Sequence, residues 1–123
     1  MATPPFACLE TLQHRAVHYA CYYREKGSEA FFAGNEEHFP SASLIKVPIA
    51  LAWATLERQG LVSRADMCDL DAEPPVQGAG FSWLLRARRL PYQDVLLIML
   101  ALSDNLCTNA VIEKIGMERL NRV

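Results

Sequence analysis

The chain has 123 residues, enough for about one domain with a modest hydrophobic core. Its 12 Lys and Arg and 14 Asp and Glu give a net charge of −2, and these charges are scattered, which excludes a nucleic-acid stripe or a basic membrane-surface helix. No apolar run reaches the roughly 18 residues of a spanning helix, and Met1–Leu12 lacks the pattern of a secretory signal. The sequence as written therefore predicts a cytoplasmic protein with no nucleic-acid partner and no membrane span.

The first part of the chain is expected to form a short helix and a hairpin. Thr3–Pro5 is typical of a helix start, and apolar residues follow at helical intervals. His14–Arg24 is rich in Val and Tyr and favours a strand, Glu25–Ser28 favours a turn, and Glu29–Ala33 favours a partner strand.

The next part predicts a helix and a surface connection. Ser43–Ala54 is apolar or small apart from Lys46, and the segment continues to Gln59 before Gly60, which favours a buried helix that ends there. Residues 61–80 hold many Asp, Pro and Gly residues and indicate a long surface connection, followed by a short helix from Phe81.

Two further helices are predicted around a polar triplet. Pro91 precedes eight consecutive apolar residues, Val95–Leu102, and Leu106–Ile115 is expected to form another helix that ends at Gly116. Both helices are expected to be buried. Ser103-Asp104-Asn105 lies between them, and on its own this triplet is explained by helix capping.

Metal and nucleotide sites are not favoured. The four cysteines, Cys8, Cys21, Cys68 and Cys107, form no C-x-x-C pair, which favours buried or free thiols. His14 and His18 have the spacing of H-E-x-x-H, but Arg15 stands in place of the glutamate. Gly78-Ala79-Gly80 follows no strand of a βαβ unit and lacks the third glycine of a nucleotide-binding fingerprint.

Lys46 is the one cation in the apolar stretch Ser43–Ala54. An ammonium group buried without partners costs several kcal/mol, on the order of the penalties measured for unpaired charges, so packing alone does not explain this residue. Ser43 lies three residues earlier, on the same face of a helix, and a deprotonated amine there can take the serine proton. The alternative is a lysine that extends to water from the first turn. Pro48 indicates a loosened first turn in either case.

Ser43-x-x-Lys46 together with Ser103-Asp104-Asn105 resembles the class A serine β-lactamases. The likeness covers about residues 14 to 123. It implies an α+β fold of the β-lactamase/transpeptidase type, with an antiparallel sheet and an all-helical subdomain, of which this is the N-terminal portion. The resemblance assigns residues 1–42 to the helix and first strands of the sheet domain, and 43–123 to an incomplete helical domain.

The resemblance also implies the roles of individual residues. Ser43 attacks the lactam carbonyl, and its backbone N–H is half of the oxyanion hole. Lys46 helps to deprotonate Ser43, and Ser103 relays a proton to the departing nitrogen. Asn105 binds the side-chain amide of the substrate, whereas Asp104 holds the helix junction together. The substrate is then a β-lactam or a peptidoglycan-like molecule, with no cofactor and no metal.

Two elements of the family pattern are missing from the sequence. A glutamate on a later loop and a lysine-threonine-glycine strand, which serve deacylation and carboxylate binding in that family, do not occur in these 123 residues. We therefore expect a second chain or segment that carries the C-terminal half. Three functions remain open: a class A β-lactamase, a penicillin-binding DD-peptidase or esterase of the same fold, and a non-catalytic piece that complements a second chain. Members of the resembled family are usually periplasmic or secreted.

Overall fold

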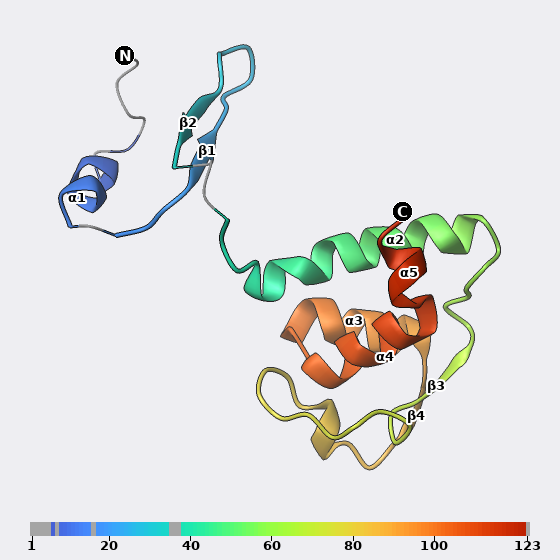
Figure 1. The fold of residues 1–123 in the computed structure, drawn as a ribbon. Helices are drawn as coiled ribbons and strands as arrows, with labels where there is room; N and C mark the ends of the chain where they lie inside the picture. Colours follow the sequence, from blue (N-terminus) through green and yellow to red (C-terminus); the bar gives the residue numbers. More distant parts are fainter. Residues whose placement is uncertain (1–5, 7, 16, 35–37, 123) are drawn as a thin grey trace. The chain divides into compact units, whose positions relative to one another are not determined.

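The computed structural model describes residues 6, 8–15, 17–34 and 38–122, and the chain divides into two compact units between Pro40 and Ser41. The elements in chain order are α1 (Cys8–His14), β1 (Cys21–Tyr23), β2 (Phe31–Ala33), the 3-10 helix η1 (Ala42–Ile45), α2 (Lys46–Arg58), β3 (Met67–Asp69), the 3-10 helix η2 (Ser82–Leu84), β4 (Arg89–Pro91), α3 (Tyr92–Leu102), α4 (Asn105–Ile115) and α5 (Met117–Leu120) (Figure 1). Among the described helices, none has the length and apolar character needed to cross a membrane.

The first unit contains α1 and the predicted hairpin. β1 and β2 pair antiparallel, with Tyr22 opposite Phe32 and their ring centroids 5.1 Å apart. Such a cross-strand pair stabilises a hairpin, although two strands alone are only marginally stable in water. The strand expected over His14–Arg24 is shorter than predicted, because α1 continues through His14 and β2 offers only three residues for pairing. The helix start predicted at Thr3–Pro5 lies outside the described residues.

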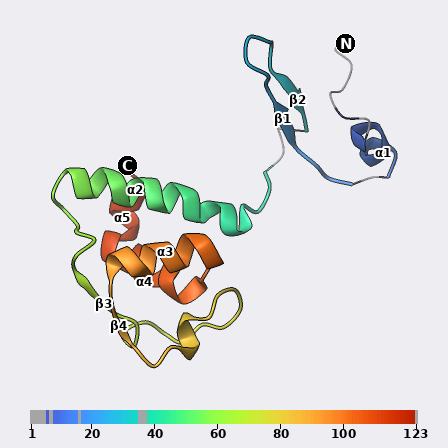
Figure 2. The same ribbon diagram turned by 180° about the vertical axis from the view of Figure 1, so that it is seen from behind.

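The second unit is built around α2. In both ribbon views α3 and α4 run side by side next to α2 (Figures 1 and 2). Large side chains from these helices and from the connection after α2 form its core: Ile49, Trp53, Leu56, Leu70, Val95, Met99, Leu106, Val111 and Ile115. Removal of this apolar surface from water stabilises the unit. It also holds the C-terminus of α3 and the N-terminus of α4 next to the start of α2.

The expectation that the apolar helices are buried on every face is wrong. On α2, Val47 and Leu51 are exposed, and on α3 Leu97 and Leu100 are exposed, with Leu51 retaining 64% of its accessible surface. Each helix therefore packs through one face only within this unit. The uniform apolar composition of the two helices hid this asymmetry, since it leaves no polar stripe to mark the outer face.

The connection after α2 contains a small sheet that the composition did not predict. β3 and β4 pair antiparallel, with Met67 opposite Pro91 and Asp69 opposite Arg89. Strands of three residues carry no readable alternation, and the partners lie far apart in sequence. The pairing fixes the start of α3 directly after Pro91, as predicted, and closes the long connection into a loop (Figure 2).

Candidate active site

The junction of η1 and α2 places Ser43 and Lys46 beside each other. η1 is a 3-10 helix, which is wound more tightly than an α-helix, so the turn before Lys46 departs from α-helical geometry but is not loosened as predicted. Pro48 is the third residue of α2, where a backbone N–H has no intrahelical partner to lose. Lys46 Nζ donates to Ser43 Oγ at 3.2 Å.

The turn between α3 and α4 brings the S-D-N triplet to the same point. Ser103 ends α3 in the left-handed region (φ 56°, ψ 32°), which is uncommon for a residue other than glycine. Asp104 then caps the N-terminus of α4, so only two residues separate the helices. This tight reversal directs the Ser103 carbonyl and hydroxyl, and the Asn105 side chain, toward Lys46.

Lys46 is the centre of the cluster. Its side-chain nitrogen donates to Ser103 O at 2.7 Å, to Ser103 Oγ at 2.9 Å and to Asn105 Oδ1 at 3.0 Å, in addition to Ser43. Lys46 is only 5% exposed, so the alternative of a lysine extended into water is wrong. The amine is buried and satisfied by neutral oxygens from three separate residues, which offsets the cost of removing it from water.

The two serine hydroxyls also contact each other. Ser103 Oγ donates to Ser43 Oγ at 2.6 Å, so Ser43, Lys46 and Ser103 form a closed triangle of hydrogen bonds. Ser43 is exposed, and its hydroxyl can meet a molecule from solvent. A proton can therefore pass among three groups that lie within hydrogen-bond distance of an accessible nucleophile.

Asp104 is completely buried, and the hydrogen-bond partners of its carboxylate lie outside this triangle. Its Oδ1 accepts from Ser82 Oγ at 2.6 Å and from Cys107 N at 2.9 Å, and its Oδ2 accepts from Ser82 N at 2.8 Å. Burial alone raises the pKa of Asp104, but the hydrogen bonds from Cys107 and Ser82 outweigh it, and the net pKa is lowered. The prediction that Asp104 holds the junction together is confirmed.

The structure brings together all four residues named from the sequence as catalytic or substrate-binding: Ser43, Lys46, Ser103 and Asn105. The sequence did not predict that Asn105 also binds Lys46, or that Ser82 holds Asp104. Ser82 lies 22 residues before Asp104. It is the first residue of η2 and follows a connection with no periodic pattern, so no sequence signal marked it.

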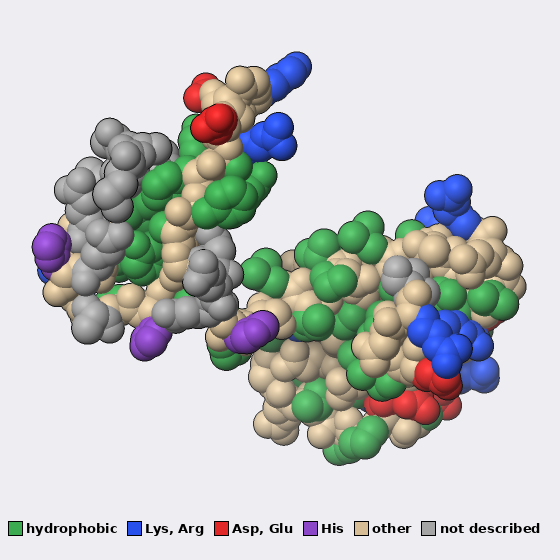
Figure 3. Space-filling model, turned by 45° about the horizontal axis from the view of Figure 1, so that its top comes forward, with side chains coloured by type: hydrophobic (Ala, Val, Ile, Leu, Met, Phe, Trp, Pro, Cys, Tyr) green, Lys and Arg blue, Asp and Glu red, His purple; other side chains and the backbone are tan. Residues whose placement is uncertain are grey.

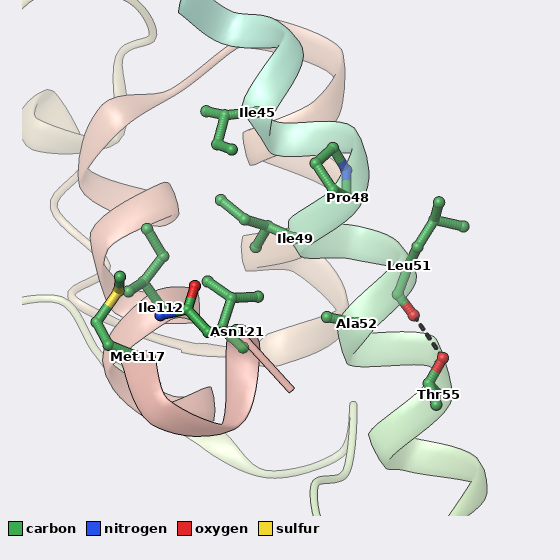
Figure 4. Close-up of a pocket in the computed structure, with 10 residues that line it drawn as sticks. Ile45, Pro48, Ile49, Leu51, Ala52, Thr55, Ile112, Met117 and Asn121 are labelled. Atoms are coloured by element: carbon green, nitrogen blue, oxygen red, sulfur yellow. Dashed lines mark hydrogen bonds between the residues drawn. The ribbon is translucent and has the colours of Figure 1, made fainter. Parts of the chain in front are cut away.

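A separate apolar hollow of about 590 Å³ lies between α2 and the α4–α5 corner (Figure 4). It is lined by Ile45, Pro48, Ile49, Leu51, Ala52, Thr55, Ile112, Met117, Leu120 and Asn121. None of the four residues of the cluster lines it, although Ile45 stands in the chain between Ser43 and Lys46. The residues that line the hollow include no acid or base.

Solved structures with a similar fold are known. The solved structure of PBP-A superposes with a TM-score of 0.76 at 23% identity, over 98% of this chain and 48% of PBP-A. A variant of PBP-A in its acyl-enzyme complex with penicillin G gives 0.77 at 24% identity, over 94% and 46% of the two chains. A β-lactamase from Sphaerobacter thermophilus gives 0.69 at 25% identity, over 78% and 37%. The chain thus spans less than half the length of these structures. No curated protein matches it.

The fold is therefore that of the β-lactamase/transpeptidase type, as the sequence predicted. Residues 9–123 match the model of the Beta-lactamase enzyme family, and the chain belongs to that family.

Proposed function

We propose that this chain carries the nucleophile of a serine hydrolase of the class A β-lactamase type, which opens the β-lactam ring through an acyl-enzyme on Ser43. The observation that carries the proposal is the triangle formed by Ser43, Lys46 and Ser103, with hydroxyl oxygens 2.6 Å apart and the Lys46 nitrogen within 3.2 Å of both. A serine hydroxyl is a weak nucleophile at neutral pH, and a base positioned beside it increases its reactivity by removing the hydroxyl proton.

In the proposed acylation, the Ser43 hydroxyl gives its proton to the unprotonated amine of Lys46 as its oxygen bonds to the lactam carbonyl carbon. The carbon–nitrogen bond of the ring then breaks, and the departing nitrogen takes a proton through Ser103, which Lys46 resupplies. The 2.9 Å contact between Lys46 Nζ and Ser103 Oγ supports this relay. Water later cleaves the ester and returns a proton to the Ser43 oxygen.

Asn105 has two roles in the proposal. Its Oδ1 accepts from Lys46, which leaves the side-chain nitrogen as the group to bind an amide oxygen of the substrate. The backbone N–H of Ser43 supplies one donor to the oxyanion, and the second donor comes from outside the described cluster. Asn105→Ala should therefore weaken substrate binding and also disturb Lys46, whereas Asn105→Asp keeps only the acceptor.

The deciding test is the number of turnovers after acylation. With a penicillin and a chromogenic cephalosporin, the complete protein should release product continuously if it is a β-lactamase, and hydrolysis should stop when Ser43 is changed to Ala. A single burst, followed by a Ser43 adduct that persists, contradicts the β-lactamase assignment.

A persistent adduct favours the second candidate, a penicillin-binding DD-peptidase or esterase of the same fold. The likeness to PBP-A, one structure of which is an acyl-enzyme complex with penicillin G, favours this candidate independently of the cluster. Both candidates share the acylation step, and they differ in whether water reaches the ester. Hydrolysis of a D-alanyl-D-alanine peptide or thioester with slow release of penicillin is the expected result for this second function.

The third possibility, that the chain acts only with a complement, rests on the hollow in Figure 4. Ile49 and Ile112 face it from opposite sides, and Leu51 and Met117 at its rim are exposed. Figure 3 shows hydrophobic side chains spread over the visible face of this unit, while its charged side chains gather toward one end. We propose that a polypeptide segment from outside this chain, which carries the second half of the fold, covers the hollow in the active protein, because the matched structures are about twice as long.

This proposal predicts that the 123-residue chain alone does not turn over β-lactams, and that addition of the complementary polypeptide restores hydrolysis of the cephalosporin. Leu51→Glu should weaken that restoration by burying a charge, whereas Leu97→Glu, an equally exposed leucine on α3 outside the hollow, should not. Unaided turnover that Ser43→Ala abolishes contradicts the need for a complement.

A further inference from the structure

Ser82 is a polar residue that the proposed mechanism does not use, and it is completely buried. It makes two hydrogen bonds to the two oxygens of one carboxylate: its hydroxyl donates to Asp104 Oδ1 at 2.6 Å and its backbone N–H donates to Oδ2 at 2.8 Å. A fork of this kind fixes both the place and the rotation of the carboxylate, more firmly than a single bond does.

The glycines before Ser82 bring this segment against the S-D-N turn. Gly80 has φ +89°, and a Cβ built there meets the Asp104 carboxylate, so a side chain at this position would displace Asp104. Asn105 N donates to Ala79 O at 3.2 Å, and a Cβ at Gly78 would lie 3.1 Å from Asn105 Nδ2. The Gly78-Ala79-Gly80 motif, which fits no nucleotide fingerprint, thus allows close approach to Asp104 and Asn105.

Asp104 is the residue between Ser103 and Asn105, and both neighbours bind Lys46. Ser103 supplies its carbonyl at 2.7 Å, and Asn105 supplies its Oδ1 at 3.0 Å. Ser103 also holds the left-handed conformation that a residue with a Cβ adopts only at a cost of about 1 kcal/mol or more. An anchored Asp104 therefore restricts how far either neighbour can move away from Lys46.

We propose that Ser82 is a positioning residue for the reaction at Ser43: by clamping Asp104 it keeps Ser103 and Asn105 in register with Lys46. The inference rests on the proposed acylation of Ser43, and it adds to that mechanism a residue outside the triangle of Ser43, Lys46 and Ser103. Ser82 touches none of the reacting groups, so its effect passes through the geometry of the turn.

Arg88 extends the clamp away from the site. Its Nη1 donates to the Ser82 carbonyl at 2.9 Å, and its Nε forms an ion pair with Asp71 Oδ1 at 2.7 Å. Arg88 thereby ties the segment that carries Ser82 to the surface connection before it. An exposed ion pair contributes little stability by itself, so we expect Arg88 to orient η2 more than to stabilise the fold.

The test compares Ser82→Ala and Ser82→Thr in the complete, active protein. Ser63→Ala is the matched control, because the Ser63 hydroxyl accepts a local bond from Ala65 N in an exposed turn. The rate constant of Ser43 acylation by penicillin G at saturation, the dissociation constant before acylation, and the unfolding midpoint are measured for each variant. Ser82→Ala should slow acylation about 10- to 100-fold with a dissociation constant within about threefold of the parent, as expected for misplaced reacting groups.

Ser82→Thr keeps the hydroxyl and the N–H, and it should recover most of the rate. Ser63→Ala should leave it unchanged. The proposal is wrong if Ser82→Ala acylates at the parental rate, or if Ser82→Thr, folded, is as slow as Ser82→Ala. If Ser82→Ala does not fold, Ser82→Thr and Arg88→Lys are compared in its place. Arg88→Lys should then slow acylation of Ser43 by less than the roughly 10- to 100-fold expected for Ser82→Ala. An Arg88→Lys variant that acylates at the parental rate would contradict the clamp.

Hydrogen exchange separates this proposal from the proposed function. Peptides that span residues 103–108 should exchange faster in Ser82→Ala than in the parent, while peptides from α2 should not change. A parent that penicillin never acylates contradicts the proposed function. Faster exchange at 103–108 would still support the clamp in that case, and unchanged exchange would refute it.

Discussion

Replacement of Asp104 by alanine tests the junction on which the whole site depends. The change removes the acceptor of three buried donors: the hydroxyl and N–H of Ser82 and the N–H of Cys107. Water cannot replace the carboxylate readily, because Ser82, Asp104 and Cys107 have no accessible surface. Each of the two orphaned N–H groups costs about 1–3 kcal/mol, and the hydroxyl adds less because it can rotate. We expect a loss of about 3–5 kcal/mol in the free energy of unfolding, a large share of the roughly 5–15 kcal/mol of a typical domain.

Urea unfolding of the complete protein measures this loss. At a slope of about 2 kcal/mol per molar urea, the midpoint should fall by about 1.5–2.5 M with little change in slope. Asp104→Asn should lose about half as much, because its amide keeps one oxygen acceptor but turns a donor toward one of the N–H groups. Asp94→Ala is the control: Asp94 is exposed in the first turn of α3, where a carboxylate contributes at most about 1 kcal/mol. A loss for Asp104→Ala no larger than that of Asp94→Ala would refute the proposed role of Asp104 in the junction.

Three other predictions concern single groups. Lys46→Ala should slow acylation of Ser43 by about 10²–10⁴-fold at saturating penicillin, and an unchanged rate would remove Lys46 from the mechanism. Folding lowers the pKa of Asp104, so its carboxylate stabilises the protein fully at any pH above the ordinary pKa near 3.9. This contribution is lost as the pH falls through the lower pKa of the folded state. The urea midpoints of the parent and Asp104→Asn should therefore converge in acid. Burial raises the pKa of the Cys107 thiol to about 12, so at pH 8 peptide mapping should find a thiol reagent on exposed Cys8 and not on Cys107 until urea is added.

The residues of the site were predictable from the sequence because their spacing has a direct geometric meaning. Ser43 and Lys46, three residues apart at a helix start, must share a face. A polar triplet between two apolar helices must mark a turn. That triplet marked the end of α3 at Leu102, and Gly116 marked the end of α4 at Ile115. These elements depend on residues close together in the chain, so they can be predicted from the sequence.

The contacts that complete the site were not predictable in the same way. Ser82 reaches Asp104 across 22 residues, and the β3–β4 pair joins residues about as far apart. Loops without periodicity give no signal of where they return, so their tertiary position has to be observed. The exposed faces of α2 and α3 could not be predicted for a different reason. The sequence does not distinguish an apolar residue that packs inside the unit from one that is exposed.

Acylation of Ser43 tests the central claim most directly. The complete protein is exposed to penicillin G and its intact mass is measured, followed by peptide mapping of the adduct. We expect a mass increase by one whole penicillin, since ring opening releases no fragment, located on the peptide with Ser43 and absent from Ser43→Ala. An adduct that persists in Ser43→Ala, or none on the protein while the Ser43 cluster is intact, would contradict the assignment of Ser43 as the nucleophile.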